Sequence, residues 1–201
     1  MEYRLGATDD LDAICDMVAV VIHTMETQGI YQWDAMYPTR EDFLADLQQQ
    51  TLYMATEQDV LVAIYVINRE CDPEYQAGKW QYCGEKAGIL HRLCVSPKAQ
   101  HHGVGKAVLA HIEQQLRNMG VTSVRLDVFS ENPYAIRLYE HNGYVQRGHV
   151  DWRKGRFFAD GIAGLGGVIR YAMSPLIATF FNRIHQYLLQ IIGGFFVSCH
   201  L

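Results

Sequence analysis

Hydrophobic residues in the first quarter of the chain recur at helical spacing in two segments. The first segment follows a short strand at the N-terminus and a polar capping run, and its apolar positions are Leu11, Ile14, Met17, Val18, Val21 and Ile22. Spacings of three and four residues place these side chains on one face of a helix that we expect to end near Gly29. The second segment begins at the capping sequence Thr39-Arg40-Glu41-Asp42 and turns Phe43, Leu44 and Leu47 inward. The pattern predicts two amphipathic helices joined by a loop.

The middle of the chain has the composition of β-strands. Runs rich in β-branched and other apolar residues occupy 52–55, 61–67 and 88–95, with turn-forming or polar residues between them. These runs predict an antiparallel meander. A helix over 103–119, a strand over 124–129, a helix over 133–141 and a strand over 144–150 are expected to follow. The order predicts an α/β (α+β mixed) fold, with a central, mixed, mostly antiparallel sheet flanked by helices.

Composition and charge narrow the class of protein. The 201 residues are 49% hydrophobic, which is enough for one domain with a substantial core. The net charge of -5 and the absence of a long Lys/Arg run lead us to expect no nucleic-acid partner. The five cysteines are never spaced as CxxC, which favours reduced thiols over a disulfide framework or a zinc site. Since the N-terminus also lacks a signal-peptide pattern, we expect a cytoplasmic protein.

The segment that follows the third β-run has the pattern of an anion-binding loop. A strand ends at Val95, Pro97 prevents its continuation, and a helix starts among Gly103 and Gly105. Successive backbone N–H groups and the positive end of the helix dipole would then converge on one place. Glycines let a bulky diphosphate approach the main chain, and Lys106 adds charge in the first turn.

Two other phosphate-binding loops do not fit this segment. A dinucleotide-binding fingerprint would need a glycine in place of Val108. A Walker A loop would need a glycine in place of Gln100 and a Ser or Thr in place of Ala107. The adjacent His101 and His102 lack a third ligand at helical or turn spacing, so we expect no metal. A glycine turn that only joins the strand to the helix remains as the alternative.

Two blocks of sequence resemble the GNAT acetyltransferase superfamily. The first is Gln100-x-x-Gly103-x-Gly105, directly after the strand that ends in Val95. The second runs from Asn132 to Tyr144 and reads NPYAIRLYEHNGY. Two blocks in the right order and at the right separation are more specific than either alone. The resemblance is to an uncharacterised bacterial subgroup of the superfamily and covers roughly residues 1–158.

The resemblance implies a binding site for acetyl-coenzyme A as co-substrate. Main-chain groups of the strand end would pair with the pantetheine arm like an added strand, and amides of the glycine loop would hold the diphosphate. Two residues of the second block would lie beside the arm. The residues expected to contact the cofactor are Leu93, Cys94, Val95, Gln100, His101, His102, Gly103, Val104, Gly105, Lys106, Asn132 and Ala135.

Acetyl transfer to an amine needs a base, an oxyanion donor and an acid for the departing thiolate. The resemblance points Tyr139 at the sulfur, and a tyrosine with an ordinary pKa of about 10 carries its proton at neutral pH. His91 is the first choice as base because imidazole titrates in the useful range. A backbone N–H near Leu93 is the candidate oxyanion donor. The alternatives are a core tyrosine and a structural histidine, and Glu70, Asp127 and His149 are weaker candidates for the base.

These observations together predict the reaction. We expect an N-acetyltransferase that moves the acetyl group to a primary amine of a small molecule, amino acid or peptide by direct attack in a ternary complex. The alternative is a non-catalytic module that binds acetyl-CoA. The aromatic residues Trp33, Tyr37 and Trp80 are candidates for contacting the acceptor, whereas Trp33 and Tyr37 would otherwise pack the helix pair.

Residues 159–201 depart from the family pattern. The glycine-rich run from Ala159 to Gly167 breaks the expected strand, and Ser174-Pro175 then starts an amphipathic helix near 175–192. Its polar face argues against a membrane-spanning helix. We expect a domain over 1–158 and an apolar C-terminal extension that packs on it or forms a homodimer. A late strand over 195–198, peripheral membrane contact, and a tail acquired by frameshift or fusion are the alternatives.

Overall fold

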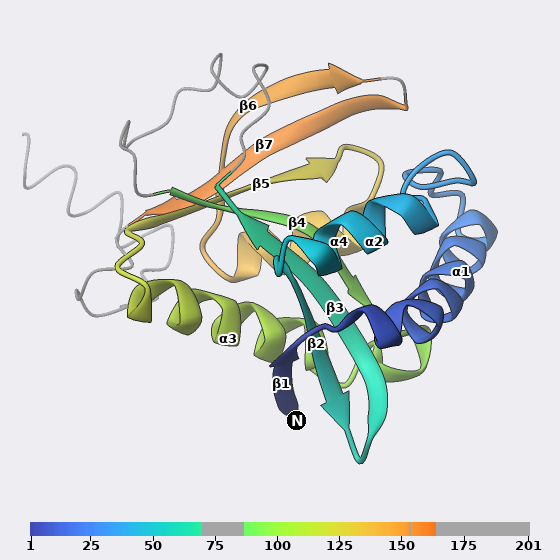
Figure 1. Cartoon of the computed structure of the whole chain (residues 1–201). Coiled ribbons are helices and arrows are strands. Elements are labelled where there is room, and N and C mark those ends of the chain that lie inside the picture. The colour runs from blue at the N-terminus through green and yellow to red at the C-terminus, as the bar shows by residue number, and fades with distance from the viewer. Residues whose placement is uncertain (70–86, 153, 164–201) are drawn as a thin grey trace, which may run out of the picture. The chain divides into compact units, whose positions relative to one another are not determined.

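Seven strands of this computed structural model form a single sheet in the order β1-β2-β3-β4-β5-β7-β6 (Figure 1). The structure describes residues 1–69, 87–152 and 154–163. The strands are β1 (Glu2–Leu5), β2 (Leu52–Glu57), β3 (Val60–Asn68), β4 (Ala87–Val95), β5 (Ser123–Phe129), β6 (Val145–Trp152) and β7 (Gly155–Ala163). The helices are α1 (Leu11–Thr27), α2 (Arg40–Gln48), α3 (Val104–Asn118) and α4 (Pro133–His141).

The sheet is mixed and mostly antiparallel, which confirms the predicted fold class. Strands β1 to β4 pair antiparallel with their neighbours, and β7 pairs antiparallel with both β5 and β6. Among the strands that the structure describes, only β4 and β5 run parallel, and their pairing is limited to Ala87–Leu90 against Ser123–Leu126. A parallel pair needs a crossover connection, and α3 lies in that connection. The one parallel junction thus lies in the middle of the sheet.

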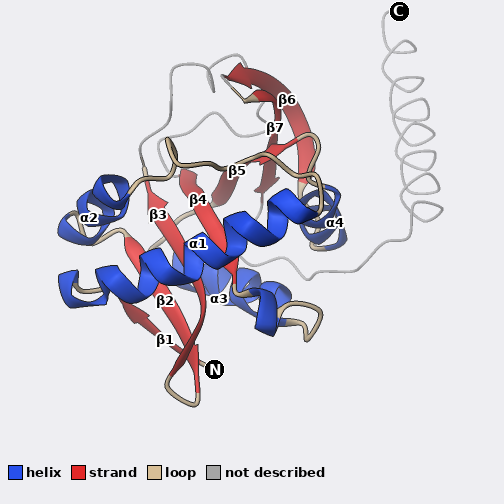
Figure 2. Ribbon diagram, turned by 90° about the vertical axis from the view of Figure 1, so that its right-hand side faces the viewer, coloured by secondary structure: helices blue, strands red, loops and turns tan. Residues whose placement is uncertain are grey.

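Helices cover both faces of the sheet. The apolar side of α1 and α2 packs on one face around residues such as Ile14, Phe43 and Ile64. The other face carries α3 and α4, whose core includes Leu109 and Tyr139. Figure 2 shows α1 lying across the strands on its own side of the sheet. Among the helices that the structure describes, none is long and apolar enough to span a membrane.

Local signals explain where two of the helices begin. Thr39 accepts a hydrogen bond from the Asp42 amide, and the Asp42 carboxylate accepts the Thr39 amide at 2.7 Å, which completes a capping box at α2. Asn132 caps α4 by accepting the Ala135 amide at 3.0 Å, with Pro133 in the first turn. Both helix starts confirm the predictions from sequence.

The last described strand extends beyond the predicted break in the pattern. The sequence ends regular structure at Phe158, but β7 continues to Ala163 and pairs with β5 over Ser123–Phe129. Ladder hydrogen bonds are made by the main chain, and β7 has a partner strand on each side. Small residues after Phe158 therefore do not end the strand. The predicted helix near 175–192, the late strand, Glu70 and Trp80 lie outside the described residues.

Candidate functional site

A bulge in β4 opens the sheet in its middle. Cys94 pairs with Ile64 and His91 pairs with Val66, so two residues of β4, Arg92 and Leu93, lie opposite the single intervening residue of β3. An extra residue in one strand bends that strand and ends regular pairing. The parallel ladder with β5 stops at Leu90, immediately before the bulge. Beyond this point β4 and β5 separate.

The separated edge of β4 presents main-chain groups toward the opening. The Ser96 amide donates to the Val62 carbonyl of β3 at 2.8 Å. Because bonded residues alternate along an antiparallel ladder, the main-chain groups of Val95 point away from β3. The Gln100 side chain donates to the Val95 carbonyl at 3.0 Å and so ties the following loop to the strand end. The edge can accept an extended ligand as a further strand.

In the part of the chain that the structure describes, the loop before α3 and the first turn of α3 carry backbone donors without acceptors. The first bond of the helical ladder is from the Ala107 amide to the Gly103 carbonyl, at 3.0 Å. Within the described part of the chain, the amides of residues 101–106 have no hydrogen-bond partner. His101 and Gly103 both have positive φ, 63° and 81°. Alternation of this kind curves successive N–H groups into an anion-binding concavity at the helix N-terminus.

A cavity of about 830 Å³ joins this loop to the opening in the sheet. It is lined by every residue predicted to contact the cofactor except His102, namely Leu93, Cys94, Val95, Gln100, His101, Gly103, Val104, Gly105, Lys106, Asn132 and Ala135. Both candidate catalytic residues, Tyr139 and His91, also line it. His102 is exposed. The structure thus brings together residues that the sequence spreads over about fifty positions.

Tyr139 belongs to the core and to the cavity wall. Its side chain on α4 is 6% exposed, and its ring lies 5.5 Å from the ring of Tyr144. Two readings of the sequence, a core tyrosine and a residue facing the reacting groups, are therefore both compatible with its place. Packing against Tyr144 and the sheet fixes the ring in position.

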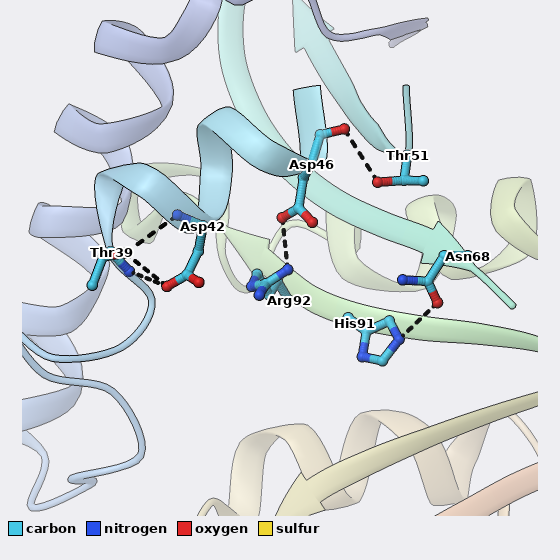
Figure 3. A network of polar contacts seen from close by, with 7 residues as sticks. All are labelled: Thr39, Asp42, Asp46, Thr51, Asn68, His91 and Arg92. Atoms are coloured by element: carbon cyan, nitrogen blue, oxygen red, sulfur yellow. Dashed lines mark hydrogen bonds and ion pairs between the residues drawn. The ribbon is translucent and has the colours of Figure 1, made fainter. Parts of the chain in front are cut away.

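His91 is held by a neighbouring strand. Its Nε2 lies 3.0 Å from Oδ1 of Asn68 at the end of β3 (Figure 3). In the tautomer that protonates Nε2, this nitrogen donates to the amide oxygen and Nδ1 is the basic nitrogen. The contact orients the imidazole of His91 at the cavity wall.

Arg92, at the bulge, reaches α2. Its Nη1 lies 2.6 Å from Oδ2 of Asp46, and the two side chains are only 15% and 9% exposed (Figure 3). The guanidinium carbon lies 5.2 Å from the centroid of the Tyr37 ring, within cation–π range. A strand, a helix and the loop between α1 and α2 meet at this side chain. Sequence analysis did not select Arg92 or Asp46.

Several contacts around the cavity were also not predicted. Asn132 donates through Nδ2 to Oε1 of Gln32 at 2.9 Å, across 100 positions of sequence. Lys154, before β7, forms an ion pair with Asp34 in the loop between α1 and α2. Trp33, which the sequence analysis did name, is 7% exposed, packs with the two helices and also lines the cavity. No local pattern in the sequence could have revealed these pairs, because each joins segments that only the fold brings together.

The positions of three side chains, Cys94, Asp127 and His149, bear on the chemistry that the cavity can support. Burial raises the pKa of the Cys94 thiol to about 12, so this side chain is not a thiolate at neutral pH. Asp127 on β5 lines the cavity, whereas His149 is exposed on β6. Among the described residues, no group of three or more His, Cys, Asp or Glu side chains is placed to hold a metal ion.

The sequence matches one family model and several known proteins. The model of the acetyltransferase (GNAT) family matches residues 20–144. The [ribosomal protein bS18]-alanine N-acetyltransferase of Escherichia coli (strain K12) is 34% identical over 71 residues, which are 33% of this chain and 48% of that protein. The chain thus spans about half the length of this relative. The S-(2-succino)cysteine N-acetyltransferase of Bacillus subtilis (strain 168) is 22% identical over 157 residues, or 76% of this chain and 89% of that protein.

A solved structure shares the fold. The structure of yncA, a putative acetyltransferase from Salmonella typhimurium with its cofactor acetyl-CoA, superposes with a TM-score of 0.60. The two sequences are 16% identical, and the match covers 86% of this chain and 99% of that one. At this identity the likeness concerns the fold alone.

Proposed function

Because the chain belongs to the acetyltransferase (GNAT) family, we propose that it transfers the acetyl group of acetyl-CoA to a primary amine. One observation carries the proposal. The backbone amides of residues 101–106, which have no partner among the described residues, lie at the wall of a cavity that Tyr139 and His91 also line. An anion-binding loop and candidate acid and base groups thus share one space.

The cavity wall offers a place for each part of the cofactor. The amides of residues 101–106 would hold the diphosphate, with Lys106 adding positive charge. The free edge of β4 at Leu93 and Val95 would pair with the amides of the pantetheine arm. Asn132 and Ala135, at the start of α4, would lie beside the arm on the other side. The thioester would then lie near the point where β4 and β5 separate.

The residues around that point supply the proton transfers and charge stabilisation. His91 would take a proton from the ammonium group of the acceptor and pass it to water. The neutral nitrogen would attack the thioester carbon, and a main-chain N–H near Leu93 would donate to the oxyanion. When the carbon–sulfur bond breaks, Tyr139 would give its proton to the departing thiolate. The nitrogen would lose its second proton to solvent, which gives the neutral amide, and Tyr139 would regain a proton from solvent. The acetylated amine and coenzyme A are the products.

The state of Cys94 supports direct transfer within a ternary complex. An acyl-cysteine route requires a thiolate nucleophile. Cys94 is the cysteine that lines the cavity among those described, and its raised pKa of about 12 keeps it protonated. The amine therefore attacks the thioester itself in our proposal.

Replacing Cys94 with alanine tests the direct route. We expect kcat within about threefold of the unaltered chain, because the thiol takes no part in bond making. The measurement is coenzyme A release at 25 °C with saturating acetyl-CoA and amine. Loss of turnover by more than about a hundredfold in a folded variant would point to a covalent intermediate instead.

The acceptor is proposed as a small molecule, an amino acid or a peptide terminus. Support comes from the names of the two relatives, one acting on a protein alanine and the other on a cysteine derivative. The acceptor side of the cavity would be formed by the lining residues Trp33, Tyr37, Asp127 and Lys154, the last of which forms an ion pair with Asp34. This side contains both aromatic and charged groups and suits a polar amine with an apolar portion.

Thiol release over a broad amine panel tests the proposed function. The full chain is incubated with acetyl-CoA and each amine, and we expect release above the amine-free background for at least one class. Isothermal titration of acetyl-CoA in parallel separates the two candidate functions. Binding without turnover across the whole panel would favour a non-catalytic acetyl-CoA-binding module.

The C-terminal extension is proposed to support a homodimer. The extension was expected to begin at residue 159, but a deletion placed there would remove β7 residues that pair with β5. Truncation after Ala163 leaves β7 complete and is the suitable test. We expect analytical ultracentrifugation to give a dimer for the full chain and a monomer for the shortened chain. An unchanged mass would contradict the role of the extension.

A reducing compartment fits the thiols that the structure describes. Cys15 and Cys94 are free, and Cys94 is buried. Disulfides are uncommon in reducing compartments, so these free thiols support a cytoplasmic location as a proposal. Mass spectrometry after alkylation of the native protein, extracted without reductant, would detect every thiol that has formed a disulfide.

A further inference from the structure

We propose that Arg92 is a positioning residue whose side chain, fixed by Asp46 and Tyr37, holds the β4 bulge in the conformation that directs main-chain groups at the thioester. The inference rests on the proposed function and adds a role for a buried ion pair outside the predicted site. Arg92 lines the cavity, and its partner Asp46 does not. Asp46 therefore acts on the reacting groups through Arg92 and the bulge, without contacting the cavity.

The backbone conformation of Arg92 in the bulge is strained. Arg92 has φ of 49°, a left-handed backbone value that residues other than glycine rarely adopt. The sequence has no glycine there, although glycine would adopt this φ without strain. Strained residues of this kind persist only where surrounding contacts fix them, and they are frequent at functional sites. The contacts of the Arg92 side chain are thus the natural cause.

Those contacts come from two different elements. Asp46 on α2 binds Nη1 at 2.6 Å, and α2 is itself fixed by its capping box and by the bond from Thr51 Oγ1 to the Asp46 carbonyl (Figure 3). Tyr37, from the loop before α2, packs on the guanidinium at 5.2 Å. A side chain held from α2 and from its preceding loop has little freedom to rotate. The peptide that carries it is fixed in turn.

The location of the fixed peptide connects it to the reaction. The bulge begins directly after His91 and contains Leu93, so it sets the direction of the candidate base and of the candidate oxyanion donor. A displacement of about 1 Å in such groups can lower a rate by about a hundredfold. Tyr37 also lines the cavity on the proposed acceptor side. The Arg92 side chain therefore connects the loop that carries Tyr37 to the bulge that contains the candidate oxyanion donor.

A comparison of Arg92→Ala with Arg92→Gly tests the proposal. Both variants remove the anchor, but only glycine adopts φ near 49° without strain. We expect kcat to fall by roughly 10- to 100-fold in Arg92→Ala and to recover by about tenfold in Arg92→Gly. Affinity for coenzyme A, measured by titration, should stay within about twofold in both because the diphosphate loop is untouched. Asp46→Asn should give a smaller loss of kcat than Arg92→Ala.

Controls separate positioning from general stability. Arg4→Ala breaks an ion pair with Asp10 at the surface, away from the cavity, and should leave kcat unchanged. All variants are assayed well below the Tm measured for each. Equal kcat in the unaltered chain and Arg92→Ala would overturn the inference and leave a structural ion pair. A raised acceptor KM with unchanged kcat, equal in the alanine and glycine variants, would overturn it in favour of a substrate-binding role. Absence of turnover in the unaltered chain would instead contradict the proposed function.

Discussion

Changing Tyr139 to phenylalanine is expected to lower kcat by about 10²- to 10⁴-fold, the contribution typical of a positioned general acid. The ring would keep its packing beside Tyr144, so the affinity for acetyl-CoA should not change. Without the phenol, the thiolate would leave unprotonated or wait for water. Thiol release at saturating substrates and titration of acetyl-CoA measure the two effects separately.

Tyr144→Phe is the matched control for this experiment. It removes the same atom from a buried ring 5.5 Å away, in a residue that does not line the cavity. We expect turnover close to that of the unaltered chain. If Tyr139→Phe and Tyr144→Phe lost activity equally, or if Tyr139→Phe lost none, the acid role of Tyr139 would be contradicted and its place in the core would be its only role.

Gly103→Val is expected to raise the KM for acetyl-CoA by about 10- to 100-fold, equivalent to losing one or two hydrogen bonds to a charged group. Gly103 caps α3 with φ of 81°, a value that a β-branched residue strongly disfavours. The substituted loop would turn its amides away from the diphosphate. Steady-state kinetics with varied acetyl-CoA measure the change, and kcat should be affected less than KM.

Gly120→Val carries the same backbone penalty at the other end of α3. Gly120 has φ of 72°, and an added Cβ would meet nothing within 4 Å there, as at Gly103. Both variants should therefore lose similar stability, but only Gly103→Val should weaken cofactor use. Equal KM values in the two variants would show that the loop amides do not bind the diphosphate.

Local sequence signals predicted the elements that position the cofactor loop. The helix expected over 133–141 has those bounds in α4, because Asn132 and Pro133 define its start from neighbouring residues alone. The helix after the glycine loop and the strand before it lie within one or two residues of their predicted bounds. Capping, periodicity and glycine conformation depend on residues that are close in sequence, so these features can be predicted from the sequence alone.

The remaining parts of the site depend on contacts between distant segments. The bulge arises from the register of β4 against β3, and neither strand alone shows where an extra residue will be accommodated. The Arg92–Asp46 pair joins positions 46 residues apart, and Asn132 contacts Gln32 across 100. The length of β7 follows from its two partner strands rather than from its own composition. Such features follow only from the assembled sheet.

A crystal structure of the full chain with bound coenzyme A would test the central claim most directly. The account predicts diphosphate oxygens within hydrogen-bonding distance of backbone amides in residues 101–106, and the sulfur within hydrogen-bonding reach of the Tyr139 hydroxyl. Coenzyme A bound outside this cavity, or bound in it with the sulfur directed away from Tyr139, would contradict the account.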